Sequence, residues 1–407
     1  MLRSFYLFLI TIFLLSCQKE INTPKEGNWR AVLQLNEGKE IPFLFQYNAD
    51  NSLIIKNAEE EIVVNDVSIV GDSIFIEMPV YEGFFKGVFS KDSIYGDFVK
   101  PSLNRIVPFL MKRTKDPRFP YPVAPDSEIT GNWEAVFSPN SEANKYIAKG
   151  IFKQVGNKVT GTIRTTTGDY RYLDGVLVAD TLKMSTFDGA HAFLFEAIVK
   201  DSVIQGQFYS GNHFKENFIA KRNNAYELPE PDSLTYLKEG SDRIEFSFPD
   251  VEGAVVSLDD ERFKNKIVIV QIMGTWCPNC LDETKFLSKF YEGEKREDLE
   301  IVALAFEYAP TKEKAIASIN KLVDEVGVPY PVLLAQFGTS DKKIANKKLP
   351  MLNHILSYPT TIFIDRSGAV RRIHTGFNGP ATEEKYDEFV ADFEAFVDKL
   401  IDEQSTP

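Results

Sequence analysis

The chain has 407 residues, of which 43% are hydrophobic and 26% are charged. These proportions are typical of globular proteins, and the length indicates roughly two to four domains. Acidic side chains outnumber basic ones by 59 to 46, so the formal net charge is −13 at pH 7. This charge argues against a non-specific nucleic-acid binder, which needs a basic surface to displace the counterions of phosphates. We therefore expect no nucleic-acid partner.

The amino-terminal residues have the pattern of a secretory leader. A short basic start precedes an apolar run over residues 5–15, which is shorter than the roughly 20 residues that a helix needs to span a bilayer. The run ends in Ser16 and Cys17 and resembles the lipobox of bacterial lipoproteins. The resemblance implies a signal peptide over residues 1–16, an acylated Cys17, and a lipid anchor and tether over residues 17–26. A buried or fortuitous cysteine is the alternative.

The lipobox resemblance also implies a location. The mature chain would be anchored by lipid in the cell envelope and would face the periplasm, with the membrane as a partner through Cys17. A glutamine follows Cys17 in place of the aspartate that marks inner-membrane retention in some lipoprotein systems. This difference favours the outer membrane over the inner one.

Residues 27–222 show no long helical period. They consist of short alternating runs rich in Val, Ile, Phe, Tyr and Thr, separated by Gly, Asn and Asp, which is typical of β-strands. The segment also repeats itself, because the Gly-Asn-Trp that ends at Trp29 returns as the Gly-Asn-Trp that ends at Trp133. The sequence therefore predicts two copies of one all-β domain, over residues 27–114 and 128–223.

Each copy contains about eight strand-like runs joined by turn signals. This number suits a small antiparallel barrel or a two-sheet sandwich, which limits exposed strand edges. We expect Trp29 and Trp133 to fill the cores of these domains. An aromatic shelf for a ligand is the alternative.

A third domain follows a linker over residues 224–243, whose prolines and charges predict an extended segment. The domain extends over residues 244–403. Its apolar run at 267–273 is typical of a strand covered on both faces, and it leads into Cys277-Pro-Asn-Cys280. The apolar residues that follow have helical spacing, so a helix is predicted to begin within this motif, with Pro278 in its first turn.

A cysteine at the start of a helix is suited to thiol chemistry. Free backbone N–H groups and the positive end of the helix dipole stabilise a thiolate over a thiol. We therefore predict that Cys277 is the attacking thiol. Cys280 lies one turn further along the helix and is more shielded. It is within disulfide reach of Cys277 and would be the resolving thiol. Such a pair is also half of a zinc site, but the chain has no other cysteine pair and only four histidines, so we expect neither metal nor cofactor.

Around these residues the sequence resembles the thioredoxin superfamily, and within it the TlpA/ResA-like thiol-disulfide oxidoreductases that work outside the cytoplasm. Residues 246–258 are similar to the family's opening hairpin, and Trp276 with the four residues after it matches the redox motif, including Asn279. Tyr358-Pro359-Thr360 and the apolar run after it resemble the strand that carries the family's cis-proline. The resemblance implies an α/β thioredoxin-like domain with a central mixed sheet flanked by helices.

The resemblance also implies roles for individual residues. Pro359 would be cis and face Cys277, so that a client chain pairs with the backbone beside Tyr358. Gln271 stands where thioredoxins place a buried aspartate that handles the resolving cysteine's proton, which an amide cannot take up. Glu283 stands where many members of the group carry a glutamate near the disulfide, and would relay that proton. The alternative is a first-turn glutamate that only complements the helix dipole.

The remaining segments fit this architecture. We predict a strand over 300–306, a helix over 312–326, a short strand over 330–334 and a last helix over 382–402, with Thr382 at its start. His354 and His374 are expected to be surface or hydrogen-bonded residues rather than ligands.

Three functions are compatible with this sequence. The first is an enzyme that reduces disulfides of client proteins, because Pro278 and Asn279 supply no cation that would favour a strong oxidant. Such a reductant needs a membrane thiol donor, since its compartment oxidises thiols. The second is a lipid-anchored binding protein whose β modules capture a partner while the thioredoxin domain serves as scaffold. The third is a copper carrier, which usually has three residues between its cysteines and a histidine downstream.

Overall fold

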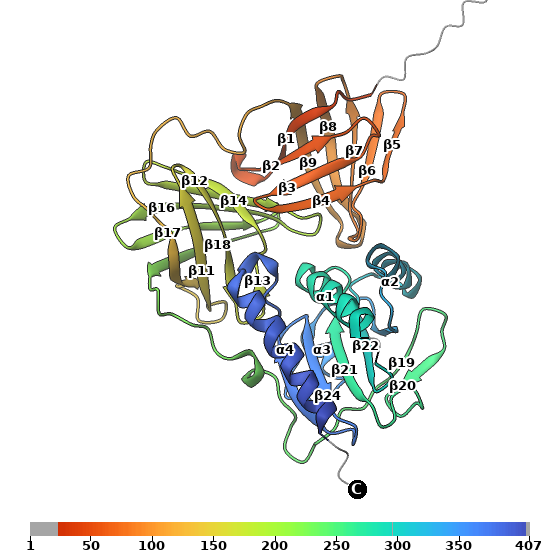
Figure 1. Cartoon of the computed structure of the whole chain (residues 1–407). Coiled ribbons are helices and arrows are strands. Elements are labelled where there is room, and N and C mark those ends of the chain that lie inside the picture. The colour runs from red at the N-terminus through yellow and green to blue at the C-terminus, as the bar shows by residue number, and fades with distance from the viewer. Residues whose placement is uncertain (1–22, 295, 404–407) are drawn as a thin grey trace, which may run out of the picture.

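The computed structural model describes residues 23–294 and 296–403. The expected signal peptide and Cys17 lie outside the described residues and stay predictions. Two antiparallel β units precede an α/β unit, as Figure 1 shows. Among the described helices, none combines the length and apolar character needed to cross a membrane.

The first β unit is one nine-stranded sheet in the order β4-β3-β2-β1-β9-β8-β7-β6-β5. The run over residues 60–70 forms two strands, separated by Asn65 and Asp66, which gives one strand more than the eight expected. The short 3-10 turns are η1 (Asn36–Gly38) and η2 (Pro101–Leu103). The strands are β1 (Gly27–Gln34), β2 (Glu40–Tyr47), β3 (Leu53–Asn57), β4 (Glu60–Val64), β5 (Val67–Val70), β6 (Ser73–Glu77), β7 (Phe84–Phe89), β8 (Ser93–Lys100) and β9 (Arg105–Arg113).

The second β unit closes on itself. Its order is β11-β10-β18-β17-β16-β15-β14-β12-β13, and β11 also pairs with β12, so the strands other than β13 form a ring. β13 is a two-residue strand that pairs with the end of β12. The strands are β10 (Gly131–Phe137), β11 (Tyr146–Val155), β12 (Lys158–Thr165), β13 (Gly168–Asp169), β14 (Leu173–Val178), β15 (Thr181–Phe187), β16 (Ala192–Lys200), β17 (Val203–Ser210) and β18 (Phe214–Arg222).

Trp29 and Trp133 occupy corresponding positions in the first strand of each unit. Both side chains are buried, at 1% and 0% exposure. Each indole N–H donates a hydrogen bond of 2.9 Å to the backbone carbonyl four residues earlier. A buried indole requires such a partner. The core prediction for both tryptophans is confirmed.

The two β units share a core. Phe187 at the end of β15 packs against Phe43 of β2, with ring centroids 4.5 Å apart. Arg118, in the connection between the units, is buried and donates to the carbonyl oxygens of Pro42 and Ser185 at 3.3 and 3.1 Å. The N–H groups of a buried guanidinium need acceptors, and Arg118 finds these acceptors on both units. The pair of β units is therefore fixed by packing and by hydrogen bonds.

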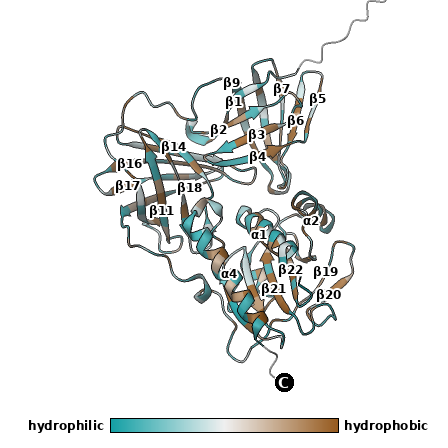
Figure 2. Cartoon of the chain, in the orientation of Figure 1, coloured by the Kyte–Doolittle hydropathy of each residue, from teal (hydrophilic) through white to brown (hydrophobic). Residues whose placement is uncertain are grey.

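The carboxyl-terminal unit is a mixed sheet in the order β23-β22-β21-β24-β25, flanked by helices. β21 lies at its centre, parallel to β22 and antiparallel to β24. Figure 2 shows hydrophobic residues concentrated in β21 and β22. The predicted thioredoxin-like fold is confirmed. Its elements are β19 (Ser247–Pro249), β20 (Val255–Ser257), β21 (Ile267–Met273), α1 (Pro278–Glu294), β22 (Leu299–Phe306), α2 (Lys312–Val326), β23 (Val332–Gln336), α3 (Lys342–Ala345), β24 (Thr360–Ile364), β25 (Val370–Thr375), η4 (Pro380–Thr382) and α4 (Glu384–Asp402).

Three predicted elements have bounds that differ from the structure, and for the strand predicted over 300–306 the difference is one residue, since β22 begins at Leu299. The last helix begins at Glu384, because Pro380 starts the short 3-10 turn η4 before it. Thr382 lies in that turn and its hydroxyl donates to the carbonyl of Gly379 at 2.8 Å, so Thr382 does not cap α4. The strand expected over 330–334 is β23, which begins two residues later, after Pro331.

The segment over residues 224–243 is extended but packed. It contains the turn η3 (Pro231–Ser233), and Asp232 pairs with Arg372 and with His374 of β25. Further on, Leu237 forms a single β-bridge with Leu352. The expected linker therefore lies against the α/β unit. His374, buried and hydrogen-bonded in its strand, has the role that the sequence predicted.

Candidate active site

The redox motif begins where β21 ends. Every residue of β21 is buried, and α1 begins at Pro278, so Cys277 lies directly before the first helical turn. Both Cys277 and Cys280 are free thiols. Cys277 is 7% exposed and Cys280 is fully buried. The backbone N–H of Cys280 donates to the sulfur of Cys277 at 3.3 Å, which is the contact expected to stabilise a thiolate at a helix start.

The loop before β24 faces the sulfur of Cys277. The Tyr358–Pro359 peptide bond is cis, as predicted. The Cys277 sulfur lies 3.3 Å from the carbonyl oxygen of Tyr358 and donates to it. Trp276 packs edge-on against the Tyr358 ring, with centroids 5.5 Å apart. Thr360 is buried and its hydroxyl donates to the loop's own backbone at 2.9 Å, so it braces this loop.

Glu283 lies in the interior below the cysteines. Its side chain is 1% exposed, and its carboxylate accepts from Gln271 at 2.8 Å and from the Thr361 hydroxyl at 2.7 Å. Gln271 also donates to the backbone carbonyl of Cys280 at 3.4 Å. Burial raises the pKa of Glu283 to about 7 and raises the pKa of the Cys280 thiol. Glu283 is thus a buried partner of Gln271 and Thr361, and its role in proton transfer stays a prediction.

A second buried carboxyl group, Glu307, was not predicted from the sequence. It follows the last residue of β22 and accepts from the backbone N–H and the hydroxyl of Thr275 at 2.8 and 2.7 Å. Burial raises its pKa to about 7. It thus anchors the loop that leads to Cys277. The available signal was an acidic residue placed directly after a continuous apolar strand.

The second β unit covers one side of the motif. The hydroxyl of Ser357 donates to the Thr167 carbonyl at 2.8 Å, and the backbone N–H of Gly379 donates to Asp169 at 2.6 Å. Gly168 has a φ of +135°, and a Cβ atom there would lie 2.0 Å from the side-chain nitrogen of Asn279. Glycine is therefore required for this close approach. Figure 1 shows β13 beside the start of α4.

Arg171 joins three parts of the chain at this point. Its side chain is 7% exposed, and it forms ion pairs with Asp282 of α1, Glu60 of β4 and Asp188, which follows β15. It also donates to the carbonyl oxygen of Pro278, inside the redox motif, at 3.2 Å. We call these four charged residues the Arg171 cluster. The sequence indicated no cation between the cysteines, and the structure brings one to the motif from another unit.

A cavity of about 460 Å³ lies between the second β unit and the redox motif. One end of the barrel supplies most of its aromatic wall, and the α/β unit supplies Cys277 and its neighbours. Its aromatic residues are Tyr146, Tyr170, Phe193, Phe208, Phe214, Trp276 and Tyr358. The sequence analysis named none of these barrel residues as functional, because they have the alternating pattern of ordinary strand residues.

Comparison with known proteins identifies the family. A model of the Redoxin family matches residues 238–390. Thioredoxin-like protein YneN of Bacillus subtilis is 30% identical over 140 residues, covering 34% of this chain and 73% of YneN. The thiol-disulfide oxidoreductase ResA of Halalkalibacterium halodurans is 26% identical over 182 residues, covering 44% of this chain and 84% of that protein. The chain belongs to the TlpA/ResA-like thioredoxin family.

A solved structure of a thioredoxin family protein from Chlorobium tepidum, described as a thiol:disulfide interchange protein, matches with 23% identity and a TM-score of 0.29. It covers 43% of this chain and 99% of that one. The match to YneN, together with the Redoxin model, confirms the family that the redox motif predicted. The protein is a thiol-disulfide oxidoreductase, and its substrates are molecules that contain disulfides.

The Arg171 cluster generates a stability prediction for this TlpA/ResA-like protein. Arg171→Met removes the cation, and we expect the free energy of unfolding to fall by about 3–5 kcal/mol because buried carboxylates lose their partner. Lys153→Met is the matched control. Lys153 of the second β unit pairs with Glu383 of the α/β unit, but these side chains are 59% and 62% exposed, so its loss should change the free energy of unfolding by at most about 1 kcal/mol. Urea denaturation followed by tryptophan fluorescence measures both, and equal effects would contradict the prediction.

Proposed function

We propose that this protein is a lipid-anchored disulfide reductase of the cell envelope that acts on client proteins through Cys277 and Cys280. The observation that carries the proposal is the position of the Cys277 sulfur, which receives the Cys280 N–H at the start of α1 and faces the cis-proline loop. Cys277, 7% exposed and directed at the cis-proline loop, is placed to meet the disulfide of a client chain. The buried Cys280 can react only with Cys277.

The proposed reaction has two exchange steps. The thiolate of Cys277 attacks one sulfur of a client disulfide, so that a mixed disulfide forms and the other client sulfur leaves as a thiolate. Cys280, once deprotonated, attacks the Cys277 sulfur, which forms the Cys277–Cys280 disulfide and releases the second client thiolate. The client gains two electrons and the protein loses two. A membrane thiol donor must return those electrons, because the compartment outside the cytoplasm oxidises thiols.

Glu283 is proposed as the proton acceptor for Cys280. Gln271 bridges the two, since its amide donates both to the Glu283 carboxylate and to the Cys280 backbone. An amide cannot hold the proton, whereas a carboxyl group with a pKa of about 7 can accept and return it near neutral pH. This match between the pKa and the working pH supports the role.

The direction of reaction is proposed from the charges near Cys277. Strong oxidants of this class stabilise the reduced thiolate. Arg171 is a cation at the motif, but Asp282, Glu60 and Asp188 surround it, so its field is largely compensated. Little additional stabilisation of the thiolate follows, which favours a reductant over an oxidant.

The organisation of the whole chain is part of the proposal. Residues 1–16 are the signal peptide, residues 17–26 the anchor and tether, and the outer membrane is favoured over the inner one. The β units, over residues 27–114 and 128–223, are proposed to be diverged copies of one domain. The corresponding burial and hydrogen bonding of Trp29 and Trp133 support this duplication.

The roles of the two cysteines can be tested by substitution. Cys277→Ser should abolish the reduction of insulin, whereas Cys280→Ser should trap a mixed disulfide with the client, because the resolving thiol is missing. Iodoacetamide should alkylate Cys277 first in the reduced protein. The redox potential, from equilibration with glutathione, should lie below about −180 mV. A higher potential, or preferential labelling of Cys280, would contradict the assignment.

The proton role of Glu283 predicts a pH dependence. Below about pH 7 the carboxyl group holds its proton and cannot accept one, so the resolution step should accelerate as the pH rises through about 7. Glu283→Gln should slow this step by about 100-fold and remove that dependence. The rate of this step is measured by stopped-flow detection of the second client thiol as it is released. An unchanged pH profile in the variant would leave Glu283 with a structural role only.

The anchor can be tested on the native protein. Mass spectrometry should find residues 1–16 absent and Cys17 acylated, and Cys17→Ala should release the protein from the membrane fraction. Unmodified Cys17 recovered from native membranes would refute the anchor.

A further inference from the structure

The cavity beside Cys277 is built from two units of the chain. Phe193, Phe208 and Phe214 come from the second β barrel, and Trp276 and Tyr358 come from the α/β unit. We propose that this cavity, the client pocket, binds an apolar side chain, preferably aromatic, next to the cysteine of a disulfide-bearing client chain. This inference rests on the proposed reductase function. According to this proposal, the second β unit selects the client.

The occupant follows from the position of the reactive sulfur. Cys277 forms part of the wall of the client pocket, so a molecule that fills the pocket and reacts must present a disulfide there. The turn around Gly168 is packed against Asn279 and against Ser357 on another side of the motif. A volume of about 460 Å³ lies within the range of small ligand sites. It accommodates side chains of an extended segment and not a folded surface.

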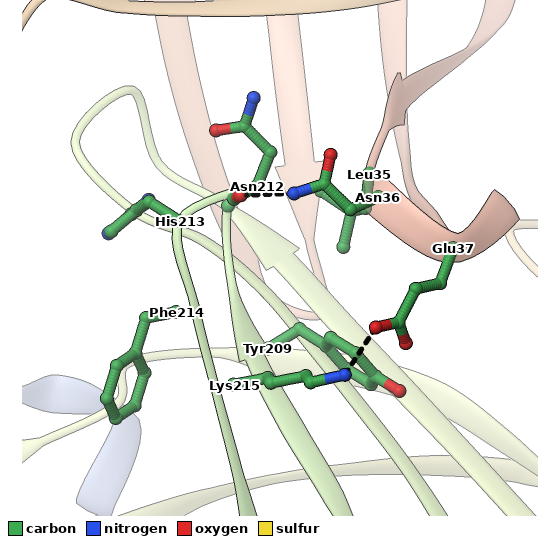
Figure 3. Close-up of a pocket in the computed structure, with 9 residues that line it drawn as sticks. Leu35, Asn36, Glu37, Tyr209, Asn212, His213, Phe214 and Lys215 are labelled. Atoms are coloured by element: carbon green, nitrogen blue, oxygen red, sulfur yellow. Dashed lines mark hydrogen bonds and ion pairs between the residues drawn. The ribbon is translucent and has the colours of Figure 1, made fainter.

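The aromatic wall determines the preferred chemistry. The rings of Phe193 and Phe208 lie 5.1 Å apart between centroids, and Tyr170 lies 5.3 and 5.4 Å from them. Such clusters favour a further ring in edge or offset contact. Phe214 is 48% exposed, and its ring lies 6.4 Å from that of Phe208. Figure 3 shows its side chain pointing away from the ion pair of Lys215 with Glu37.

The charged residues of the pocket are engaged by the protein itself. Glu216 accepts from the hydroxyls of Tyr146 and Ser138 at 2.6 and 2.5 Å. Asp169 accepts from the backbone N–H groups of Arg171 and Gly379. Burial lowers the pKa of His213 to about 4, so this imidazole is neutral at pH 7. The surface that remains for a ligand is therefore mainly the faces and edges of aromatic rings.

The test compares two disulfide-bonded peptides of equal length and charge, with Phe or Ser next to the cysteine. The wild-type protein should reduce the Phe peptide with a kcat/KM about tenfold above that of the Ser peptide. Phe214→Ala should remove most of this preference, mainly by raising KM for the Phe peptide. Phe214→Trp should keep the preference, because it keeps a ring at the rim of the pocket.

Tyr95→Ala is the matched control. Tyr95 is also an exposed aromatic residue, at 58%, but it lies on β8 in the first β unit, so its loss should leave both peptides unchanged. Circular dichroism checks that each variant folds. Oxidised glutathione is the third substrate, and its reduction should not depend on Phe214.

The possible failures can be distinguished. If the wild-type protein reduces neither peptide nor insulin, the proposed reductase function itself is wrong. If it reduces both peptides equally, or if Phe214→Ala lowers both rates alike, the client pocket is wrong and the reductase function stands. If Phe214→Ala instead slows oxidised glutathione as much as the Phe peptide, the pocket serves a small disulfide, which also overturns the proposal.

Discussion

The arrangement of this protein depends on the ion pairs of the buried Arg171 guanidinium. Removing a charge from water costs several kcal/mol unless partners replace the solvent. Here the partners are Glu60, Asp188 and Asp282, from the first β unit, the second β unit and the α/β unit. The charge can be satisfied only when all three are in place. Because Arg171 also holds the carbonyl of Pro278, the environment of the redox motif is a property of the whole chain.

The local part of this structure could be predicted from the sequence. The strand at 267–273 was predicted at its observed bounds, because a continuous apolar run ends at a glycine and the motif follows it. The contacts around Arg171 could not be predicted in this way. A charged residue near the end of a short strand has the same local sequence pattern whether it is solvated or buried. The periodicity of apolar residues shows which face of a strand is buried, but it does not show which residue a side chain contacts. For Glu307 the sequence offered only its place directly after an apolar strand, which does not identify Thr275 as its partner.

The β half acts as one rigid support for the redox domain. Phe187 of the second unit packs among the phenylalanines of the first, and Arg118 ties both units by hydrogen bonds. Packed cores resist sliding because each shift opens voids. The turn that covers the redox motif therefore belongs to a unit whose packing continues into the first β unit. Its position depends on residues far from the cysteines in the sequence.

The contact between Gly168 and Asn279 has a consequence for how such chains diversify. A Cβ atom at position 168 would collide with the amide of Asn279, and the positive φ at this position disfavours other residues as well. A change at position 279 therefore alters which side chains position 168 tolerates. A change at position 168 likewise alters which side chains position 279 tolerates. In chains that share this three-unit arrangement, the two positions should co-vary. The two residues between the cysteines would then evolve together with the second β unit.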